Sequence, residues 1–409
     1  MRVILHSDLN NFYASCESLL HPEYAGKPLV VCGKIEDRHG IVLAKNQIAK
    51  VGGVKTGMTL YECRKIFPDI VTVVANHELY HEYSKKVKDI YKDYTNYIEG
   101  FGIDEAWLDV TESIKMFGSG EKIANIIRER IKEEIGLTVS IGVSFNKVFA
   151  KLGSDMKKPD AVTVISKDNF KDKVWPLPVE DLLFVGRATK AKFNDLGIKT
   201  IGDLARFDKK ILKTKFGKVG EKLWDYSNGY DTEPVRKYTD SAEIKSVGNS
   251  LTFYRDIYDI KDIEMLFYFL AESVAERMKN YGKNLAKTLH ITVIDKELTH
   301  YSFQTSLGFP TSASFTIAET ATKLFLKHMN VKHGIRGVGV SVSNFTECEQ
   351  LLIDPEQECK EKNITLDKTM EKLRHRFGKH SIDRAIIFTD KRLQELNPSA
   401  TSINSGTIE

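Results

Sequence analysis

The sequence predicts a multidomain α+β protein whose N-terminal part is a ferredoxin-like layer. A chain of 409 residues is too long for one ordinary core, so two to four domains are expected. The first 166 residues arrange their predicted elements in the order β-α-β-β-α-β, with an insertion in the first crossover, which is the split ferredoxin-like order. Beyond residue 167 short helices alternate with glycine turns, and beyond residue 240 helices and strands mix again.

Composition narrows the class of protein. Hydrophobic residues make up 42% and charged residues 28%, as in globular domains. The net charge of +4 is small for this length, so any nucleic-acid surface must be local. The five cysteines form no CxxC pair, which argues against a zinc ribbon or disulfide framework and favours the reducing cytoplasm. The apolar start is too short for a signal peptide, and no apolar run approaches the ~20 residues of a membrane helix.

The first predicted strand, residues 2–8, ends at Asp8 and is followed by a turn that opens a helix. Open sheets place their ligands at the carboxyl edge of their strands, and Asp8 stands at such an edge. Capping of the following helix is an equally good explanation for one aspartate taken alone.

An acidic corner joins two further predicted strands, residues 97–101 and 106–110. Its adjacent carboxylates, Asp104 and Glu105, repel each other and are costly to bury without a cation. No Cys or His flanks the pair, so Mg²⁺ suits it better than zinc. An arbitrary acidic pair is more often a solvated turn. The split order, however, puts the first strand beside this corner, which predicts that Asp8, Asp104 and Glu105 converge on a metal.

The insertion at residues 27–75 is predicted to form a small subdomain. Its predicted strands are at 29–32, 41–43 and 71–74, and its predicted helix is at 59–67. Its lysines stand among glycines, a weak signal for triphosphate binding without a Walker pattern. A helix is predicted at 78–94, where His77 and His81 lack a third ligand and are interpreted as structural. A basic helix begins at Ser144 and ends before Pro159. Its lysines are either a solvated face or a clamp for phosphates.

Positive charge concentrates between residues 199 and 222. This segment contains eight basic and three acidic residues, so its net charge is +5. The basic residues are Lys199, Arg206, Lys209, Lys210, Lys213, Lys215, Lys218 and Lys222, and the acidic ones are Asp203, Asp208 and Glu221. Short helices with glycine turns present backbone N–H groups to phosphates without reading bases. This segment is therefore predicted to bind a duplex backbone.

A charged link at 233–246 leads to a last α+β unit, with helices at 262–281 and 316–329 and strands at 288–295, 299–305 and 336–345. Its polar strand faces suit a nucleic-acid groove, although a plain structural domain remains open. The apolar cluster Gln350-Leu351-Leu352-Ile353 lies in an acidic setting and reads as a docking peptide. Leu366, Met370, Leu373 and Phe377 mark a small amphipathic helix, and residues 395–409 are predicted to be disordered.

Taken together, the chain resembles the Y-family translesion DNA polymerases over residues 1 to 345. Three motifs carry the resemblance: Asp8-Leu9-Asn10-Asn11-Phe12-Tyr13, Gly102-Ile103-Asp104-Glu105-Ala106-Trp107-Leu108-Asp109, and Ser144-Phe145-Asn146-Lys147 through Lys158-Pro159. The resemblance implies a right-hand polymerase with a ferredoxin-like palm (1–10 and 75–166), fingers (11–74), a helix-hairpin-helix thumb (167–232) and an α+β little finger (240–345). A tail (346–409) follows.

The same resemblance implies roles for individual residues. Asp8, Asp104 and Glu105, with the Leu9 carbonyl, would hold two catalytic Mg²⁺ ions, for which Mn²⁺ can substitute. Tyr13 matches the steric gate that excludes ribonucleotides; the alternative is a packed aromatic at a helix start. The expected nucleotide-binding residues are Asn11, Phe12, Tyr13, Gln47, Lys50 and Lys158. The expected DNA-binding residues are Gly186, Arg187, Thr189, Gly217, Lys218, Gly220 and Arg336. Gln350 to Ile353 resemble a sliding-clamp-binding peptide.

The expected protein is thus a monomeric, distributive DNA polymerase of the bacterial cytoplasm and nucleoid, working on primer–template DNA with dNTPs. Some residues depart from the family pattern. Gln47 and Lys50 stand where a Tyr and an Arg usually grip the triphosphate, so a planar bidentate fork is lost. The first thumb hairpin has one glycine instead of Gly-x-Gly, and the clamp peptide lacks its terminal Phe. Rival functions are a silent DNA- or clamp-binding homologue, a nucleotide cyclase and a metal-dependent nuclease.

Overall fold

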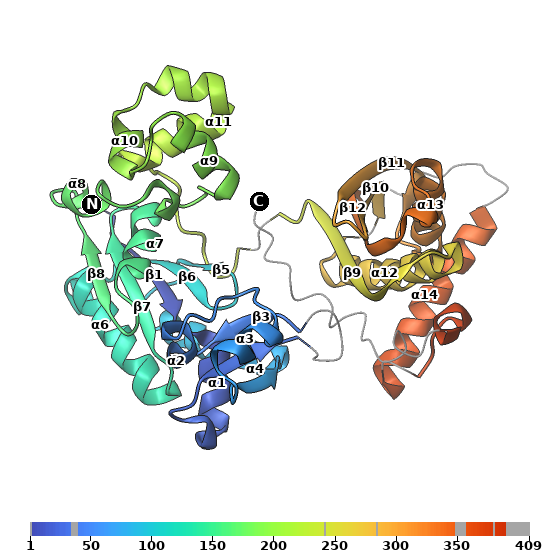
Figure 1. Cartoon of the computed structure of the whole chain (residues 1–409), viewed down its shortest axis with the longest axis horizontal. Helices are drawn as coiled ribbons and strands as arrows, with labels where there is room; N and C mark the ends of the chain where they lie inside the picture. Colours follow the sequence, from blue (N-terminus) through green and yellow to red (C-terminus); the bar gives the residue numbers. More distant parts are fainter. Residues whose placement is uncertain are drawn as a thin grey trace. The chain divides into compact units, whose positions relative to one another are not determined.

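The computed structural model describes residues 2–33, 40–240, 243–283, 285–347, 357–378 and 381–389. The chain forms two compact units, residues 1–241 and 242–409, which are treated separately below (Figure 1). In the described part of the chain, no helix is both long enough and apolar enough to cross a bilayer.

The first unit combines two sheets with eleven described helices. Its strands are β1 (Ile4–Leu9), β2 (Leu29–Cys32), β3 (Val42–Lys45), β4 (Val71–Val74), β5 (Ile98–Phe101), β6 (Glu105–Asp109), β7 (Val139–Ser144) and β8 (Val162–Ile165). Its helices are α1 (Phe12–Leu20), α2 (Gln47–Val51), α3 (Leu60–Ile66), α4 (His77–Lys92), α5 (Ile114–Phe117), α6 (Gly120–Arg130), α7 (Lys147–Met156), α8 (Phe170–Val174), α9 (Arg187–Asp195), α10 (Ile201–Arg206) and α11 (Lys209–Ser227).

The larger sheet has the strand order β5-β6-β1-β7-β8. Strand β1 runs antiparallel to both β6 and β7, so the first strand does lie beside the acidic hairpin, as the sequence predicts. Strand β8 was not predicted; it extends the ferredoxin-like sheet by pairing parallel to β7. The smaller sheet, β3-β2-β4, belongs to the insertion.

Alternate residues of β1 face opposite sides of the larger sheet, because side chains alternate along a strand. On one side, the Ser7 hydroxyl lies 2.7 Å from the hydroxyl of Tyr91 in α4. On the other side, Ile4 packs with Trp107 and with Ala150 of α7. His6 and Asp8 share this second side. Helix α7 therefore lies on the same face of the sheet as the Asp8 side chain.

A glycine lets α7 approach this sheet closely. Gly142 of β7 pairs with His6 of β1, and a Cβ at Gly142 would lie 1.9 Å from the carbonyl oxygen of Ala150 and 2.5 Å from the nitrogen of Ser154. A side chain at position 142 would therefore push α7 away from the sheet. The close approach brings the side chains of α7 into reach of β1.

The segment after α11 is anchored to this unit, although the sequence predicts a charged link at 233–246. Val235 is buried against the palm-like sheet, and the backbone N–H of Arg236 donates to Glu99 Oε2 at 3.0 Å. The Arg2 guanidinium donates to the carbonyls of Asp231 (2.6 Å) and Glu233 (2.9 Å). The first half of the predicted link is thus part of the first unit.

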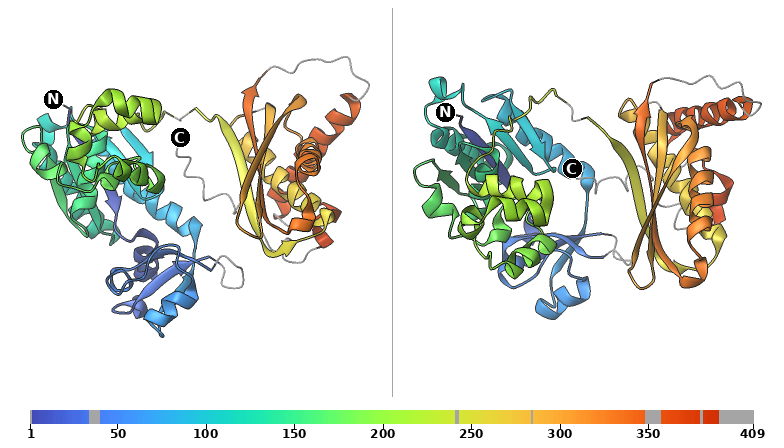
Figure 2. Two further views of the ribbon diagram at one scale, coloured as in Figure 1. Left: turned by 45° about the horizontal axis from the view of Figure 1, so that its top comes forward. Right: turned by 90° about the horizontal axis from the view of Figure 1, so that it is seen from above.

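The second unit is one antiparallel sheet with helices on one side, as the orange and yellow segments in Figure 2 show. Its strands are β9 (Ser246–Ile257), β10 (Leu285–Asp295), β11 (His300–Thr311) and β12 (Ile335–Thr346), in the order β11-β10-β12-β9. Its helices are α12 (Ile260–Asn280), α13 (Ser314–His328) and α14 (Gln357–Phe377). The sequence did not predict β9, which begins at the last residue of the predicted link and ends before the first helix predicted for this unit.

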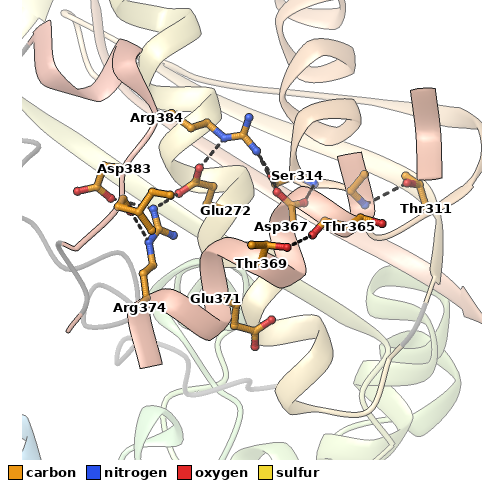
Figure 3. Close-up of polar contacts among 12 residues, drawn as sticks. Glu272, Thr311, Ser314, Thr365, Asp367, Thr369, Glu371, Arg374, Asp383 and Arg384 are labelled. Atoms are coloured by element: carbon orange, nitrogen blue, oxygen red, sulfur yellow. Dashed lines mark hydrogen bonds and ion pairs between the residues drawn. The ribbon is translucent and has the colours of Figure 1, made fainter. Parts of the chain in front are cut away.

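Segments 357–378 and 381–389 pack on the second unit through a buried ion network (Figure 3). Glu272 of α12 has a 6% exposed side chain and receives Arg374 at 3.0 Å and Arg384 at 2.6 Å. Asp367 of α14 accepts from both the backbone N–H and the hydroxyl of Ser314, each at 2.7 Å. Ile387 is buried in the core of this unit. This part of the predicted tail is therefore integral to the second unit.

Replacing Arg384 by alanine is expected to destabilise the second unit by about 3 kcal/mol, because Glu272 and Asp367 would each lose a buried partner. Hydrogen exchange should show faster exchange of α12 and α13 amides in this variant. Arg376, which is exposed near the end of α14, supplies the control, and its alanine variant should exchange like the wild type. Equal exchange in all three proteins would contradict a stabilising role for the network.

Candidate active site

The three predicted acidic residues meet at one end of β1 and β6. Asp8 pairs directly with Glu105 across the two strands, and Asp104 stands at the corner before β6. The Leu9 N–H donates to the Asp104 carbonyl at 3.1 Å, which ties the corner to the end of β1. Gly102 supplies the positive φ of 81° that turns the chain into this corner.

Burial and mutual repulsion raise the pKa values of two carboxylates in this cluster. Burial, followed by the charges of Glu105 and Asp8, raises the pKa of Asp104 from its ordinary value to about 6. Burial and then Glu105 also raise the pKa of Asp8. The carboxylates therefore carry more negative charge than their surroundings stabilise, which is the electrostatic condition for binding a cation.

Two lysines partly compensate this charge. Lys151 Nζ of α7 lies 3.0 Å from Glu105 Oε1, 2.9 Å from Glu105 Oε2 and 3.4 Å from Asp8 Oδ2. Lys158 Nζ lies 2.7 Å from Asp8 Oδ2. Asp155 contacts both ammonium groups, at 3.3 and 2.9 Å respectively. The sequence identified Lys158 as a site residue, whereas Lys151 was seen only as part of a basic helix face.

A fully buried histidine lies behind Glu105. His6 Nε2 is 3.3 Å from Glu105 Oε2, and His6 Nδ1 is 2.9 Å from the Ser154 hydroxyl of α7. Burial, and then Lys151, hold the pKa of His6 well below its ordinary value, so the imidazole is neutral. Neither His6 nor Ser154 was singled out in the sequence, because their contacts depend on how closely α7 packs.

An aromatic group lies at the start of α1, next to the cluster. Tyr13 stacks on Tyr80 with ring centroids 4.0 Å apart and an interplanar angle of 12°. The buried Tyr80 hydroxyl donates to Glu17 Oε1 at 2.6 Å, which fixes the supporting ring. Burial, and then the Asp104 charge, raise the pKa of Tyr13, consistent with a half-buried ring near the acidic corner.

The predicted nucleotide-binding residues Asn11 and Phe12 lie where α1 begins. Asn11 adopts the left-handed conformation at φ 50° and makes no side-chain cap to α1. The Phe12 side chain is only 3% exposed and belongs to the core. The first-turn N–H groups of α1 have no intrahelical acceptor, so they are available to an anion.

Several parts of the chain match known families. Residues 7–155 match the impB/mucB/samB family, residues 244–354 match the C-terminal domain of that family, and residues 180–231 match the thumb domain of DNA polymerase-iota. DNA polymerase IV of Acetivibrio thermocellus is 50% identical over 97% of this chain and 100% of the relative. DNA polymerase IV of Clostridium acetobutylicum is 35% identical over 94% of this chain and 98% of the relative.

Solved structures of Y-family DNA polymerases also match this chain. The Y-family DNA polymerase chimera Dbh-Dpo4(243-245)-Dbh matches with a TM-score of 0.74 and 26% identity, covering 84% of this chain and 99% of its own. The insertion ternary complex of Dbh DNA polymerase matches with a TM-score of 0.58 and 25% identity over the same shares. The chain belongs to the Y-family DNA polymerases.

The predicted right-hand polymerase fold and the predicted activity are thereby confirmed. This Y-family member is a translesion DNA polymerase. It binds DNA and deoxynucleoside triphosphates, and its family requires divalent metal ions. The rival functions as a cyclase or a nuclease are set aside, since the full-length relatives are named polymerases.

The chemistry of the acidic cluster fits a hard divalent cation. The side chains gathered there offer carboxylate oxygens, the ligands that Mg²⁺ prefers. Among the described residues, no three His, Cys, Asp or Glu side chains are gathered closely enough to ligate one ion as they stand. Lys151 and Lys158 contact the carboxylates instead. A bound cation would therefore have to replace these ammonium contacts.

The predicted fingers contacts lie on the insertion. Gln47 begins α2 and Lys50 follows one turn later, and both side chains are exposed. Within the described residues, neither makes a hydrogen bond or ion pair with the carboxylate cluster. Their predicted contacts to a triphosphate stay a prediction.

The predicted DNA contacts fall into different environments. Gly186 and Arg187, both exposed, begin α9, and Thr189 follows in its first turn. Gly217, at φ 62°, breaks α11 into two helices and leaves Lys218 exposed at the start of the second. Gly220 is buried instead: a Cβ there would lie 2.4 Å from the Leu212 carbonyl oxygen, so packing between the two helices explains this glycine.

The remaining predicted contacts belong to the second unit. Arg336 is partly exposed on β12. Elsewhere on this sheet, His290 Nε2 lies 2.7 Å from the Ser302 hydroxyl. The predicted clamp peptide, residues 350–353, lies outside the described residues, between Thr346 at the end of β12 and Gln357 at the start of α14.

Proposed function

We propose that Asp8, Asp104, Glu105 and the Leu9 carbonyl hold two Mg²⁺ ions, for which Mn²⁺ can substitute, in a template-directed nucleotidyl transfer. The direct pairing of Asp8 with Glu105, with Asp104 at the adjoining corner, supports this assignment most strongly. Bound divalent ions lower the pKa of a primer 3′-hydroxyl and neutralise the triphosphate and the leaving pyrophosphate. A site with no nucleophilic side chain suits this reaction, since phosphoryl transfer depends on positioning and charge.

The lysines of the cluster have two successive partners in this proposal. Lys158 and Lys151 neutralise Asp8 and Glu105 before cations bind. With divalent ions held by the carboxylates, the Lys158 ammonium would be free to bind the triphosphate. The uncapped start of α1, at Asn11 and Phe12, and the exposed Gln47 and Lys50 would bind the same phosphates.

We assign the parts of the chain accordingly. The palm is 1–10 and 75–166, the fingers 11–74, the thumb 167–232 and the little finger 240–345. The thumb would hold the duplex backbone through Gly186, Arg187, Thr189, Gly217 and Lys218, and the little finger through Arg336. The enzyme would act as a monomer beside the bacterial nucleoid. Its thumb and little-finger contacts would be phosphate contacts without base readout.

Metal removal tests the reaction directly. Enzyme treated with EDTA is expected to lose primer extension on a primed template, and added Mg²⁺ or Mn²⁺ should restore it. A matched incubation with the zinc-selective chelator phenanthroline should leave extension unchanged. Extension that survives EDTA, or that only Zn²⁺ restores, would contradict the proposed metal chemistry.

A sliding clamp is the proposed partner of residues 350–353. Replacing both Leu351 and Leu352 by alanine is expected to abolish stimulation of extension by a bacterial clamp loaded on a primed circle, while unstimulated extension stays unchanged. Leu366, a 45% exposed leucine of α14, supplies the control substitution. Undiminished stimulation of the double variant would show that the clamp binds elsewhere.

A further inference from the structure

His77, at the start of α4, lies against the two stacked tyrosines next to the carboxylate cluster. Its ring centroid is 5.9 Å from that of Tyr13 and 5.9 Å from that of Tyr80, with interplanar angles of 88° and 80° respectively. The sequence indicates only that His77 is structural. Its contacts with the two tyrosines show which side chains this ring holds in place.

Three centroid distances place His77 beside the stack. The Tyr13 and Tyr80 centroids are 4.0 Å apart. A ring over the outer face of Tyr13 would be much farther from Tyr80 than from Tyr13, whereas His77 is equally far from both. His77 therefore lies along the edges of the two tyrosines and leaves the outer face of Tyr13 to a sugar.

Phe12 lies beside the same stack, with its ring centroid 5.7 Å from that of Tyr13 and 6.2 Å from that of Tyr80. Its side chain is only 3% exposed and belongs to the core. Stacked rings keep much of their attraction when one slides over the other, because offset stacking is favourable. Stacking alone thus leaves the Tyr13 ring able to slide, and Phe12 and His77 at the edges limit that movement.

The backbone of α4 holds His77 in this place. The Asn76 side chain caps the first turn of the helix. His77 and Tyr80 are three residues apart, so both side chains lie on one face of α4. The Tyr80 hydroxyl donates to Glu17 of α1 at 2.6 Å, which fixes this face against the helix that carries Tyr13.

The His77 imidazole keeps its contact with the tyrosines at the cost of a hydrogen bond. Its Nδ1 is buried and has no hydrogen-bond partner among the residues that the structure describes. An unsatisfied buried nitrogen costs free energy, which the packing of the ring must offset. Burial, and then His81, lower the pKa of His77, so the packed ring is neutral near pH 7.

We propose that His77 is a positioning residue for sugar selection, which keeps the Tyr13 ring in place on Tyr80 when a ribonucleoside triphosphate enters. The inference rests on the proposed role of Tyr13 as the steric gate. A 2′-hydroxyl is rejected only if the gate ring cannot move aside, and His77 blocks its movement along one edge. His77 acts through Tyr13 and does not itself touch the nucleotide.

The test is the ratio of kcat/KM for a deoxynucleotide to that for the matching ribonucleotide. His77→Ala is expected to lower this ratio about tenfold, the factor that corresponds to one aromatic contact, by raising kcat/KM for the ribonucleotide. Both values come from one preparation, so the ratio does not depend on the fraction of protein that is folded. His81→Ala, at an exposed histidine one turn further along α4, is the matched control and should keep the wild-type ratio. An unchanged ratio in His77→Ala would overturn the proposal.

His77→Phe separates the ring from its nitrogens. A phenyl ring fills the same place beside the stack, so this variant should keep a ratio close to that of the wild type. A ratio as low as that of His77→Ala would show that the imidazole nitrogens act in selection, and the positioning role would be wrong.

The double variant Tyr13→Ala/His77→Ala tests whether His77 acts through the gate ring. It should discriminate as well as Tyr13→Ala alone, because no ring is left to position. A further loss in the double variant would contradict the proposal. If Tyr13→Ala lowers the ratio and His77→Ala does not, only the role of His77 is wrong. If Tyr13→Ala keeps the wild-type ratio, the gate itself has been misassigned, and the inference fails with it.

Discussion

Replacing Asp104 by alanine is expected to reduce primer extension at least about 1,000-fold, because removing one metal ligand forfeits several kcal/mol of charge stabilisation in the transition state. Asp104 stands at the corner where β1 and β6 meet, and burial, followed by the charges of Glu105 and Asp8, raises its pKa to about 6. Its removal leaves Asp8 and Glu105 with their lysine partners. The measurement is single-nucleotide extension at saturating DNA and dNTP.

The matched control for this variant is Asp155→Ala. Asp155 is also a carboxylate in contact with Lys151 and Lys158, yet it lies on α7 and outside the proposed ligand set. Its loss should change extension far less than the loss of Asp104. DNA affinity should be kept in both variants. Comparable defects in the two would indicate that the cluster acts through general charge and not through specific ligands.

Replacing Tyr13 by alanine is expected to lower discrimination between dNTP and rNTP by about 100-fold, the range that a pocket gains from excluding one hydroxyl. The Tyr13 ring is held by stacking on Tyr80, so it can resist a 2′-hydroxyl rather than swing aside. The quantity to measure is the ratio of kcat/KM for a deoxynucleotide to that for the matching ribonucleotide. Extension with dNTPs should persist.

Tyr61→Ala controls for loss of a tyrosine from the same part of the chain, because Tyr61 is 70% exposed on α3. That variant should keep the wild-type ratio. Unchanged discrimination in Tyr13→Ala would show that Tyr13 is only a packed aromatic at the start of a helix, the alternative that the sequence left open.

Much of the fold could be predicted because its elements have clear periodicity. The β-α-β-β-α-β order placed the first strand beside the acidic corner, and the structure confirms that neighbourhood through the pairing of Asp8 with Glu105. Strand β9 was missed since its polar and apolar residues do not alternate clearly. Strand β8 was missed because it is short and follows directly on the segment that contains Pro159.

Features that depend on packing between distant segments could not be predicted from the sequence. Lys151 and Ser154 matter only because Gly142 lets α7 lie close to β1, and nothing near them in the chain reveals this. The glycine of the second thumb hairpin at Gly220 looks like a phosphate-binding glycine until the Leu212 carbonyl is seen against it. Likewise, nothing in the sequence around Glu272 indicates that this residue is buried in ion pairs with Arg374 and Arg384.

Counting bound Mn²⁺ tests the central claim most directly. The measurement is an equilibrium titration of the complex of enzyme, dideoxy-terminated primer–template and dNTP, with free dNTP at the same concentration as background. The proposed site predicts two Mn²⁺ ions per wild-type complex, and weaker or incomplete binding in Asp8→Asn and Asp104→Asn. Equal stoichiometry and affinity in all three proteins would contradict a metal site at the junction of β1 and β6.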